Sequence, residues 1–410
     1  MSFAARLAHM SGASRAEDTA IVPEPLERSF ARRLASKARW SSPGFARHVY
    51  AVGVTGWEPL SPLPASLTEH AVVDRSTLER AVGLVHGHER RAPVFLDLET
   101  TGLGSAAHAL AFIIGVAHLP EPGRFELVQW TLETPTAERA MLRDVAATLE
   151  RALGPGSTLV TFNGASFDVP LLAGRLRRLG LAAPVALQQA PHLDLLHVSR
   201  RLAGGELPDH RLSTLEREWL GVERVGDLSG AEVARVFEQL VHSSGAPWVR
   251  ERLAQAQAHN RLDLVTSALL SHRLAQSLER PAGLAAAVRA ANHFVRCERL
   301  DLASACVQPF LRWSAEPESQ GDPAVVRAFA ELLRRLGNPD AAARLWAWLC
   351  VQCPGDVQAH EALAKDLEHR RRRPEQALVV AEASSAPCAR RLARLRRKVA
   401  RQASTDSARP

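Results

Sequence analysis

The chain has 410 residues, of which 46% are hydrophobic and 23% are charged, and its mean hydropathy is −0.11. These values describe a soluble globular protein that is long enough for two or more domains, each with its own core. The longest apolar stretch, residues 109–117, is about half as long as a membrane span, so no transmembrane helix is expected.

A formal net charge of +7 and a pI near 9.8 make the chain basic, which favours a polyanionic partner such as nucleic acid. Lys37, Lys365 and Lys398 are the only lysines, so nearly all of the 51 basic residues are arginines, whose planar forks pair well with phosphate. Genomic base composition explains the same richness in arginine and alanine equally well. Composition alone therefore leaves the partner open.

The five cysteines are an odd number, clustered in the last third of the chain, and do not indicate a disulfide framework. Residues 1–18 contain no apolar core of the kind that a signal peptide carries. Both observations predict a cytoplasmic protein with no membrane association.

Residues 1–90 are punctuated by prolines, in segments such as Ser42-Pro43-Gly44 and Leu63-Pro64. The first long strand pattern begins only after them. We interpret the segment as an irregular arm that wraps on the next domain.

Residues 91–280 carry a mixed α/β pattern. Short turns separate the first three expected strands, which predicts an antiparallel meander, and helical periodicity on both sides of the fourth indicates a crossover to a parallel position. Three meandering strands followed by α/β units is the chain order of the RNase H-like fold. The expected strands are 94–98, 109–117, 125–131 and 158–162, and the expected helices are 136–152, 168–179, 212–220, 231–240 and 259–278.

Residues 281–400 read as entirely helical, and two of their segments align at a shift of about 35 residues, near the tetratricopeptide period. Residues 329–342 and 363–377 share a proline and small residues at matching places. An unrelated helical bundle is the alternative. The basic runs 370–373 and 390–401 are read as solvated helix faces or frayed tails, with nucleic-acid contact as the minority interpretation. Residues 401–410 are expected to be a disordered tail.

The segment Val94-Phe95-Leu96-Asp97-Leu98-Glu99-Thr100-Thr101-Gly102 is the most informative in the chain. Asp97 and Glu99 stand at i and i+2 of an apolar strand, so both carboxylates leave on the same face. Two anions side by side repel each other and lose hydration, a penalty that a divalent cation such as Mg²⁺ or Mn²⁺ removes. The wet face of an edge strand is the alternative environment for such a pair.

A second acidic position follows the strand that ends near Asn163. Gly164 permits a tight turn, and Asp168 then falls in the first turn of a helix. Alone, Asp168 is equally well explained as a charge at a helix N-terminus. Together with the acids of the first strand, it becomes a candidate metal ligand.

A third position is His259-Asn260-Arg261-Leu262-Asp263, at the start of a long helix. His259 and Asp263 are four residues apart and share one helical face. Alone, this pair is an ordinary surface contact. As the last members of the acidic set, Asp263 completes a carboxylate cage and His259 lies beside it, within reach of an attacking water.

Asp97-x-Glu99, Asp168 and Asp263 resemble the four-carboxylate set of DEDD nucleases in the RNase H-like superfamily. The closer resemblance is to the YprB-like family, which combines Asp-x-Glu-Thr-Thr-Gly, Phe-Asn-Gly-x-Ser-Phe-Asp and His-Asn-x-x-Asp with a tetratricopeptide-like tail. The resemblance covers roughly 90–280 strongly and 281–400 loosely. One departure is that His259 has the spacing of the tyrosine in one DEDD branch, and the only tyrosine of the chain, Tyr50, lies far upstream.

The resemblance implies hydrolysis of phosphodiester bonds by two metal ions, Mg²⁺ or Mn²⁺, roughly 3.5–4 Å apart. Asp97 would bridge both ions, Glu99 and Asp168 would complete their shells, and Asp263 would hold the ion beside the nucleophilic water. His259 would orient or deprotonate that water. Thr100 and Asn163 either contact the substrate or fix the turns.

The function predicted from the sequence is thus a metal-dependent nuclease, a 3′→5′ exonuclease acting on DNA or RNA, with a single-stranded end as its substrate. The alternative is a nucleic-acid-binding or scaffold protein whose RNase H-like domain is weakly active or inactive. A protein partner bound through the helical repeats is compatible with both.

Overall fold

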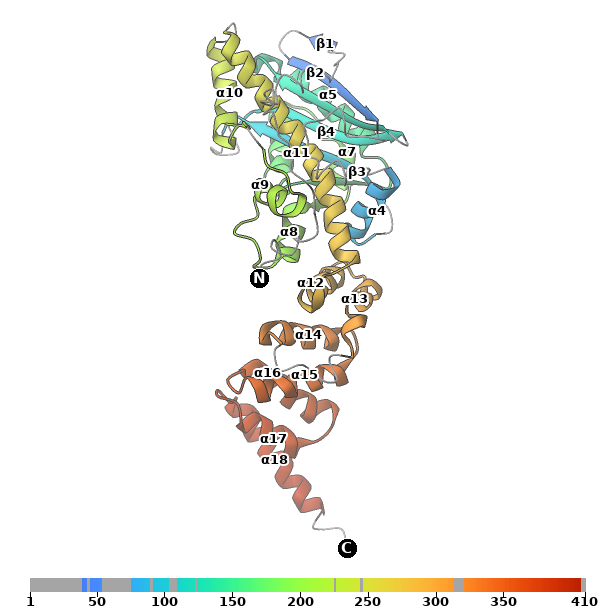
Figure 1. Cartoon of the computed structure of the whole chain (residues 1–410), viewed down its shortest axis with the longest axis vertical. Helices are drawn as coiled ribbons and strands as arrows, with labels where there is room; N and C mark the ends of the chain where they lie inside the picture. The colour runs from blue at the N-terminus through green and yellow to red at the C-terminus, as the bar shows by residue number, and fades with distance from the viewer. Residues whose placement is uncertain are drawn as a thin grey trace, which may run out of the picture.

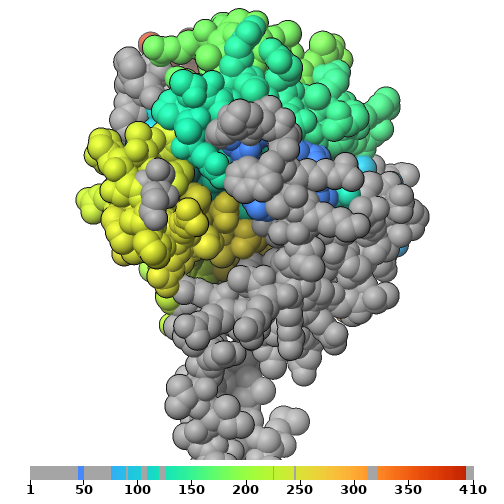
Figure 2. All heavy atoms as spheres, turned by 90° about the horizontal axis from the view of Figure 1, so that it is seen from above, coloured from blue at the N-terminus to red at the C-terminus, as the bar shows by residue number. Residues whose placement is uncertain are grey.

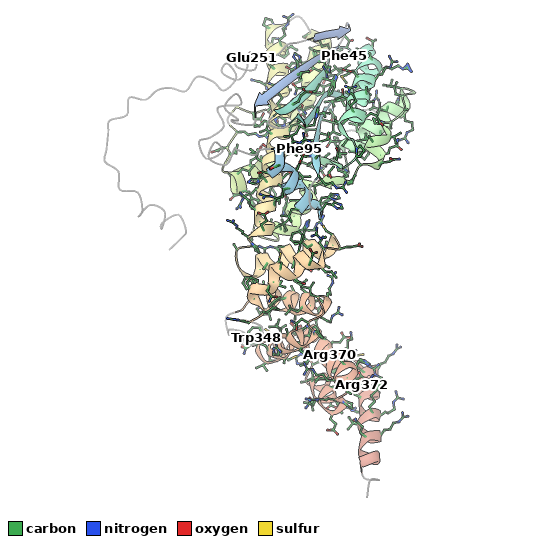
Figure 3. The ribbon with its side chains drawn as sticks, turned by 90° about the vertical axis from the view of Figure 1, so that its right-hand side faces the viewer. Phe45, Phe95, Glu251, Trp348, Arg370 and Arg372 are labelled. Atoms are coloured by element: carbon green, nitrogen blue, oxygen red, sulfur yellow. The ribbon has the colours of Figure 1, made fainter. Side chains whose placement is uncertain are left out.

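The computed structural model describes residues 39–42, 45–53, 75–88, 91–102, 109–121, 124–224, 226–243, 246–312 and 321–406. They form an α/β domain at one end of an elongated molecule and a column of paired helices that extends away from it (Figure 1). In the side view, Phe95 lies within the α/β domain, whereas Trp348, Arg370 and Arg372 lie in the helical column (Figure 3). The predicted fold class is confirmed.

A mixed seven-stranded sheet with the order β1-β2-β5-β4-β3-β6-β7 forms the centre of the α/β domain. As predicted, β3, β4 and β5 form an antiparallel meander, and β6 lies parallel to β3. The strand β7 continues the parallel edge beside β6. The strands are β1 (Arg39–Ser42), β2 (Phe45–Gly53), β3 (Ala92–Thr100), β4 (Ala111–Glu121), β5 (Arg124–Leu132), β6 (Ser157–Thr161) and β7 (His192–Asp194).

The described part of residues 1–90 is regular, which corrects the prediction of an irregular arm for these residues. β2 pairs with β5 over its whole length, β1 pairs with β2, and helix α4 (Arg75–His86) packs on β3. Strand formation here depends on pairing with a segment far away in the chain, which local periodicity does not reveal. The other residues of 1–90 lie outside the described ranges.

The two faces of β3 contribute to two separate cores. Val94, Leu96 and Leu98 pack with residues of α5 (Glu138–Ala152) and α6 (Asp168–Arg178). Phe95, which is fully buried, packs on the opposite face with residues of α4 and α11 (Pro247–Glu279). Because side chains alternate along a strand, the acidic positions two and four residues after Phe95 face α11.

The long helix α11 crosses one face of the sheet and leads into the helical column (Figure 1). Its 33 residues correspond to a length of about 50 Å. It begins at Pro247, in the first helical position that proline favours, rather than at residue 259 as predicted. The first turns carry mostly alanine and polar side chains, and they therefore lack the apolar stripe by which a helix is recognised.

Shorter helices complete the α/β domain, and α10 and the segment 212–220 match predicted helices, whereas α7 and α8 were not predicted. The predicted helix 212–220 is a short α-helix that continues as a π-helical turn, which Gly221 ends in the left-handed conformation at φ 66°. These elements are α7 (Val185–Gln189), α8 (Leu195–Ala203), α9 (Leu212–Leu215), the π-turn Glu216–Leu220 and α10 (Gly230–Ser243).

The helical column confirms the predicted repeat. Pro339 and Pro374 each begin the second helix of a pair, and Ala342 and Ala377 are fully buried where the helices touch. The last helix continues to Asp406, so the expected disordered tail is wrong for 401–406. The helices are α12 (Gly283–Arg296), α13 (Leu300–Val307), α14 (Pro323–Arg335), α15 (Pro339–Gln352), α16 (Val357–Lys365), α17 (Pro374–Glu382) and α18 (Ala389–Asp406).

The basic runs of this column are largely paired with acidic residues of the column itself. Asp366 binds the guanidinium groups of two arginines, and the buried Glu368 binds basic side chains from α18. This pairing favours a structural role for these side chains. The pairs are Arg370 and Arg371 with Asp366, and Arg394 and Lys398 with Glu368. None of the helices in the described ranges combines the length and apolar character that crossing a lipid bilayer requires.

The column is attached to the α/β domain where α12 meets the end of α4. The Nε2 atom of His293 donates to the carbonyl of Val85 at 2.8 Å, and Arg299 donates to the carbonyl of Gly87 at 3.3 Å. These contacts satisfy carbonyls that the end of a helix leaves free. Gly87 has φ +88°, and a Cβ placed on it would lie 2.5 Å from the Cβ of Cys297, so only glycine fits here.

We expect this junction to weaken as the pH falls. Burial lowers the pKa of His293 from 6.5 to about 4, because its Nδ1 is buried without a hydrogen-bond partner and no acceptor receives a second proton. Between these values the unfolded chain binds a proton that the folded chain does not, so the free energy of unfolding falls by about 3 kcal/mol from pH 6.5 to 4.

The substitution His293→Gln should flatten this part of the stability curve, measured by urea unfolding at a series of pH values. His242→Gln, at an exposed histidine, is the control. An unchanged pH slope in His293→Gln would contradict the assignment.

Candidate metal centre

Asp97 and Glu99 lie on the face of β3 that α11 covers. Asp97 is paired in register with Gly115 of β4. A Cβ on Gly115 would lie 2.4 Å from Oδ1 of Asn260 and 2.5 Å from a methyl group of Leu264. The missing side chain therefore allows α11 to approach the sheet directly beside the acidic strand.

A chain of buried amides holds Asp97 in place. The Nδ2 atom of Asn260 donates to Oδ2 of Asp97 at 2.7 Å and to its carbonyl at 3.2 Å. The Oδ1 atom of Asn260 accepts from Gln129 at 2.8 Å, and Gln129 in turn accepts from Arg261 at 2.9 Å. Asn260 and Gln129 are fully buried. The amide chain fixes the direction of the Asp97 carboxylate relative to α11.

Gly115→Ala should lower the free energy of unfolding by about 1–3 kcal/mol, because the added methyl group overpacks the contact between β4 and α11. It should also disturb the hydrogen bond between Asn260 and Asp97. Chemical denaturation measures the first effect. Gly174→Ala is the control, since a Cβ there meets nothing within 4 Å. Equal stability of both variants would contradict the tight contact.

Asp168 begins α6 immediately after the turn that follows β6. The carboxylate of Asp194 holds this turn, accepting from the backbone N–H groups of Asn163 at 2.9 Å and Ala165 at 3.0 Å. It also accepts from the N–H of Leu196 at 3.1 Å and so caps α8. Asp194 is therefore a helix cap that at the same time positions the turn leading to Asp168.

Asn163 and Thr100 both lie at the ends of strands. Asn163 has φ 65°, a left-handed conformation that asparagine tolerates, and its side chain is exposed. Thr100 is buried at the end of β3. Gly164 lies between Asn163 and α6, and a Cβ on it would be 2.8 Å from Oδ2 of Asp168. The geometry thus supports a role of Asn163 in the turn, and its exposed side chain is also accessible to a substrate.

His259 and Asp263 lie on the same face of α11, with Nε2 of His259 3.7 Å from Oδ2 of Asp263. The other ring nitrogen, Nδ1, donates to Oδ2 of Asp227 at 2.8 Å. Asp227 lies in the segment before α10 and was not predicted. Its hydrogen bond orients the imidazole so that Nε2 faces the acidic cluster.

Arg224 is a second residue that sequence reasoning missed. Its guanidinium donates to Asp263 at 2.5 Å, to Asp227 at 2.9 Å and, through two nitrogens, to Glu216 at 2.5 and 2.8 Å. Glu216 lies in the π-turn, is almost fully buried, and also accepts from the hydroxyl of Thr266 at 2.6 Å. No spacing or motif in the sequence identifies Arg224, because its position is set by the fold.

The structure brings the five predicted catalytic residues together. One ligand atom each from Glu99, His259 and Asp263 lies within 4.8 Å of the others, which is close enough to share a metal ion. The carboxylates of Asp97 and Asp168 interact electrostatically with these acids. Three separate segments of the chain thus meet at one point.

The electrostatics show that these acids repel one another. Burial and the charge of Asp263 raise the pKa of Asp97 to about 7. Burial and the charge of Asp97 also raise the pKa values of Glu99 and Asp168. For His259, burial favours the neutral ring, but the charge of Asp263 and the hydrogen bond to Asp227 outweigh it and raise the pKa to about 10.

Oxygen ligands from four carboxylates together with one imidazole suit Mg²⁺ or Mn²⁺. The raised pKa values of the acids are an independent sign of fit, because a bound cation would relieve the repulsion that causes them. The arrangement therefore fits divalent cations at Asp97, Glu99, Asp168 and Asp263, with His259 beside them.

In the absence of divalent cations, Asp168→Asn should raise the melting temperature, because it removes one of the mutually repelling buried carboxylates. Adding Mn²⁺ should raise the melting temperature of the unsubstituted protein more than that of the variant. Differential scanning fluorimetry with and without EDTA measures both. Glu375→Gln, at an exposed acid of α17 in the helical column, is the control. A destabilised variant together with no response to Mn²⁺ would contradict the cluster.

Comparison with known proteins agrees with this geometry. Residues 94–275 match the family model of the RNase_H superfamily, and residues 323–366 match that of the tetratricopeptide repeat. The α/β domain is thus similar to RNase H superfamily domains, and part of the helical column is similar to a tetratricopeptide repeat. It is similar to YprB of Bacillus subtilis (strain 168), described as uncharacterized, with 27% identity over 358 residues that cover 80% of this chain and 83% of YprB. The resemblance drawn from the motifs is confirmed.

Solved structures of exonuclease I are also similar over part of the chain. E. coli exonuclease I in complex with a dT13 oligonucleotide has 19% identity and a TM-score of 0.26, covering 40% of this chain and 42% of that one. A product-bound exonuclease I has 14% identity and a TM-score of 0.26, covering 72% of this chain and 98% of that one. This chain spans less than half the length of the E. coli structure.

Proposed function

We propose that this chain is a metal-dependent nuclease of the DEDD type that hydrolyses phosphodiester bonds of DNA or RNA as a 3′→5′ exonuclease. The observation that carries the proposal is the convergence of Asp97, Glu99, Asp168, His259 and Asp263 from β3, α6 and α11. The RNase H superfamily match over 94–275 includes all five residues. Carboxylates that are partly or fully desolvated and gathered at one point are costly for folding, so a purely structural role does not account for them.

Two divalent ions, Mg²⁺ or Mn²⁺, would be held by these carboxylates. Asp97 would be one of their ligands, and Asn260 fixes the direction of its carboxylate. Glu99 and Asp168 would complete the two shells, and Asp263 would hold the ion on the side of His259. Such ions supply charge neutralisation at the scissile phosphate and lower the pKa of a bound water.

His259 is the candidate proton acceptor of the reaction. Asp227 holds its Nδ1–H, so Nε2 is the nitrogen that faces the cluster. Its raised pKa means that the ring is protonated at neutral pH while the acids around it are charged. Neutralising Glu99 and Asp263 would remove the charges that hold this proton and would return the imidazole to a range where it can act as a base.

One observation favours the alternative, a nucleic-acid-binding or scaffold protein with a weakly active domain. The guanidinium of Arg224 is 2.5 Å from Oδ1 of Asp263 and thus already neutralises one of the acids. A cation bound there has to compete with this ion pair. The presence of all four carboxylates nevertheless favours the enzyme. Whether the chain is an enzyme or a binding protein, the helical repeats are the part that would bind a protein partner.

Asp97→Ala and Asp263→Asn should each lower kcat/KM by more than about a hundred-fold, because a direct ligand matters more than the outer groups that support it. The assay uses end-labelled single-stranded DNA and RNA with Mn²⁺, and gels that separate stepwise shortening from internal cleavage. EDTA should abolish the activity of the unsubstituted protein. Asp301→Asn is the matched control on the exposed surface of the column.

Stepwise shortening from the 3′ end supports the proposed exonuclease activity. Internal bands would show that the enzyme is an endonuclease instead. Cleavage that persists in both site variants would exclude the cluster as the catalytic centre. Salt-sensitive binding without any turnover would favour the binding protein.

A further inference from the structure

A hollow lies between α10 and the first turns of α11, beside the metal centre. Its volume is about 420 Å³, within the range of pockets that hold small molecules. In the view from above, the surface of α10 and of the start of α11, in yellow, adjoins the part of the α/β domain that is drawn in teal (Figure 2). The lining residues are Gly226, Asp227, Leu228, Glu232, Trp248, Glu251, Arg252 and Gln255.

One face of α11 connects the hollow to His259. Trp248, Arg252, Gln255 and His259 follow one another at intervals of four, three and four residues, which places them along one side of the helix. The inner end of the hollow is Asp227, which is hydrogen-bonded to His259. The axial distance from Trp248 to His259 is about 16 Å. The hollow therefore leads from the metal centre along the helix.

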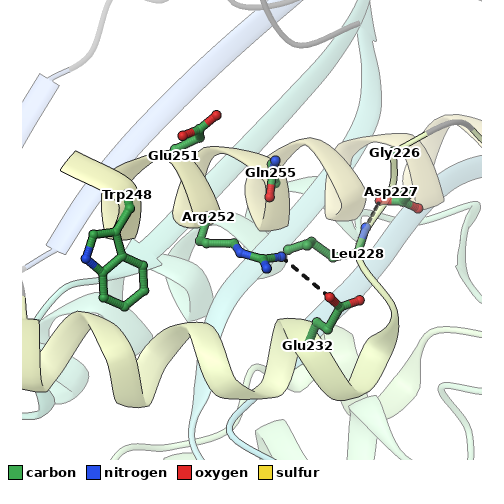
Figure 4. Close-up of a pocket in the computed structure, with 8 residues that line it drawn as sticks. All are labelled: Gly226, Asp227, Leu228, Glu232, Trp248, Glu251, Arg252 and Gln255. Atoms are coloured by element: carbon green, nitrogen blue, oxygen red, sulfur yellow. Dashed lines mark hydrogen bonds and ion pairs between the residues drawn. The ribbon is translucent and has the colours of Figure 1, made fainter. Parts of the chain in front are cut away.

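Trp248 is the aromatic side chain that lines this hollow. Half of its surface is exposed, and it points from α11 toward α10 (Figure 4). A large exposed indole is costly in water unless it contacts something. Arg252 points into the same gap, whereas Glu251 points away from it (Figure 4). A flat aromatic surface next to a guanidinium is the combination that stacks unpaired nucleobases.

The charges of the hollow favour a base over a phosphate. Glu232 is held by the hydroxyl and the N–H of Ser229 at 2.8 and 2.9 Å, and Arg252 lies 3.6 Å from it, so these two charges offset each other. Asp227 is already paired with Arg224 and His259, and Glu251 points away from the gap (Figure 4), so the lining of the hollow carries no unpaired cation for a phosphate. The hollow is thus unsuited to a phosphate and suited to a neutral, flat heterocycle.

We propose that this hollow, the α10–α11 pocket, binds an unpaired nucleobase of the substrate by stacking it on Trp248, several nucleotides away from the scissile phosphate. The proposal rests on the proposed nuclease function and deepens it, because a pocket for an unstacked base selects single-stranded nucleic acid. Bases in a duplex are paired and stacked, and the pocket would exclude them.

The test measures binding of single strands to the full-length chain in the inactive Asp97→Ala background by fluorescence anisotropy. Trp248→Ala should weaken the binding of a strand of about 12 nucleotides on the order of ten-fold. It should leave the binding of a dinucleotide unchanged, because a dinucleotide is too short to span the distance from the metal centre. Trp248→Phe should restore most of the affinity, since phenylalanine also stacks.

Val241→Ala is the matched control, because Val241 is an exposed apolar side chain of α10 that does not line the pocket. A further series of strands carries a single abasic site at successive positions. At one position the abasic site should weaken binding to the protein that has Trp248, and it should have no effect on binding to Trp248→Ala.

If Trp248→Ala binds long strands with the same affinity as the protein that has Trp248, the proposal that the α10–α11 pocket binds a base is wrong. If the protein without any substitution cleaves such strands while the Trp248 variants bind normally, the pocket alone is wrong and the nuclease stands. If the unsubstituted protein neither binds nor cleaves single strands, the proposed function fails as well.

Discussion

The mutual repulsion of buried carboxylates is the constraint around which this structure is organised. Burial and the charges of the neighbouring acids, Asp263 among them, raise the pKa values of Asp97, Glu99 and Asp168. Folding has to hold these acids together against their charge. The surrounding elements provide the means, through apolar cores on both faces of the sheet and a fixed hydrogen-bond chain to the central carboxylate.

Helix α11 is the element that combines these tasks. One of its ends covers the gap between α10 and the sheet, its middle carries His259, Asn260 and Asp263, and its far end reaches the helical column. Gly115 lets it lie directly on β4, so the amide of Asn260 reaches Asp97. A displacement of α11 therefore affects the acidic cluster and the attachment of the column together.

Two further groups adjust the charge of the cluster. Arg224 neutralises Asp263, and Asp227, which is hydrogen-bonded to Arg224, holds the ring of His259. Arg224 thus places a positive charge beside the acids, and the hydrogen bond to Asp227 helps to raise the pKa of His259.

Local signals in the sequence predicted much of this fold. The alternation along β3 indicated that Asp97 and Glu99 share a face, and the short turns after it indicated the meander, because both features depend on neighbouring residues. The strands β1 and β2 were missed, since they depend on pairing with the distant β5. Arg224 and Asp227 were missed for the same reason: only the fold brings their unpatterned segment to α11.

The most direct test of the account is a crystal structure with Mn²⁺, in which anomalous scattering locates the ions. The account predicts two anomalous peaks roughly 3.5–4 Å apart between the carboxylates of β3, α6 and α11. Strong peaks elsewhere and none at this cluster would contradict it.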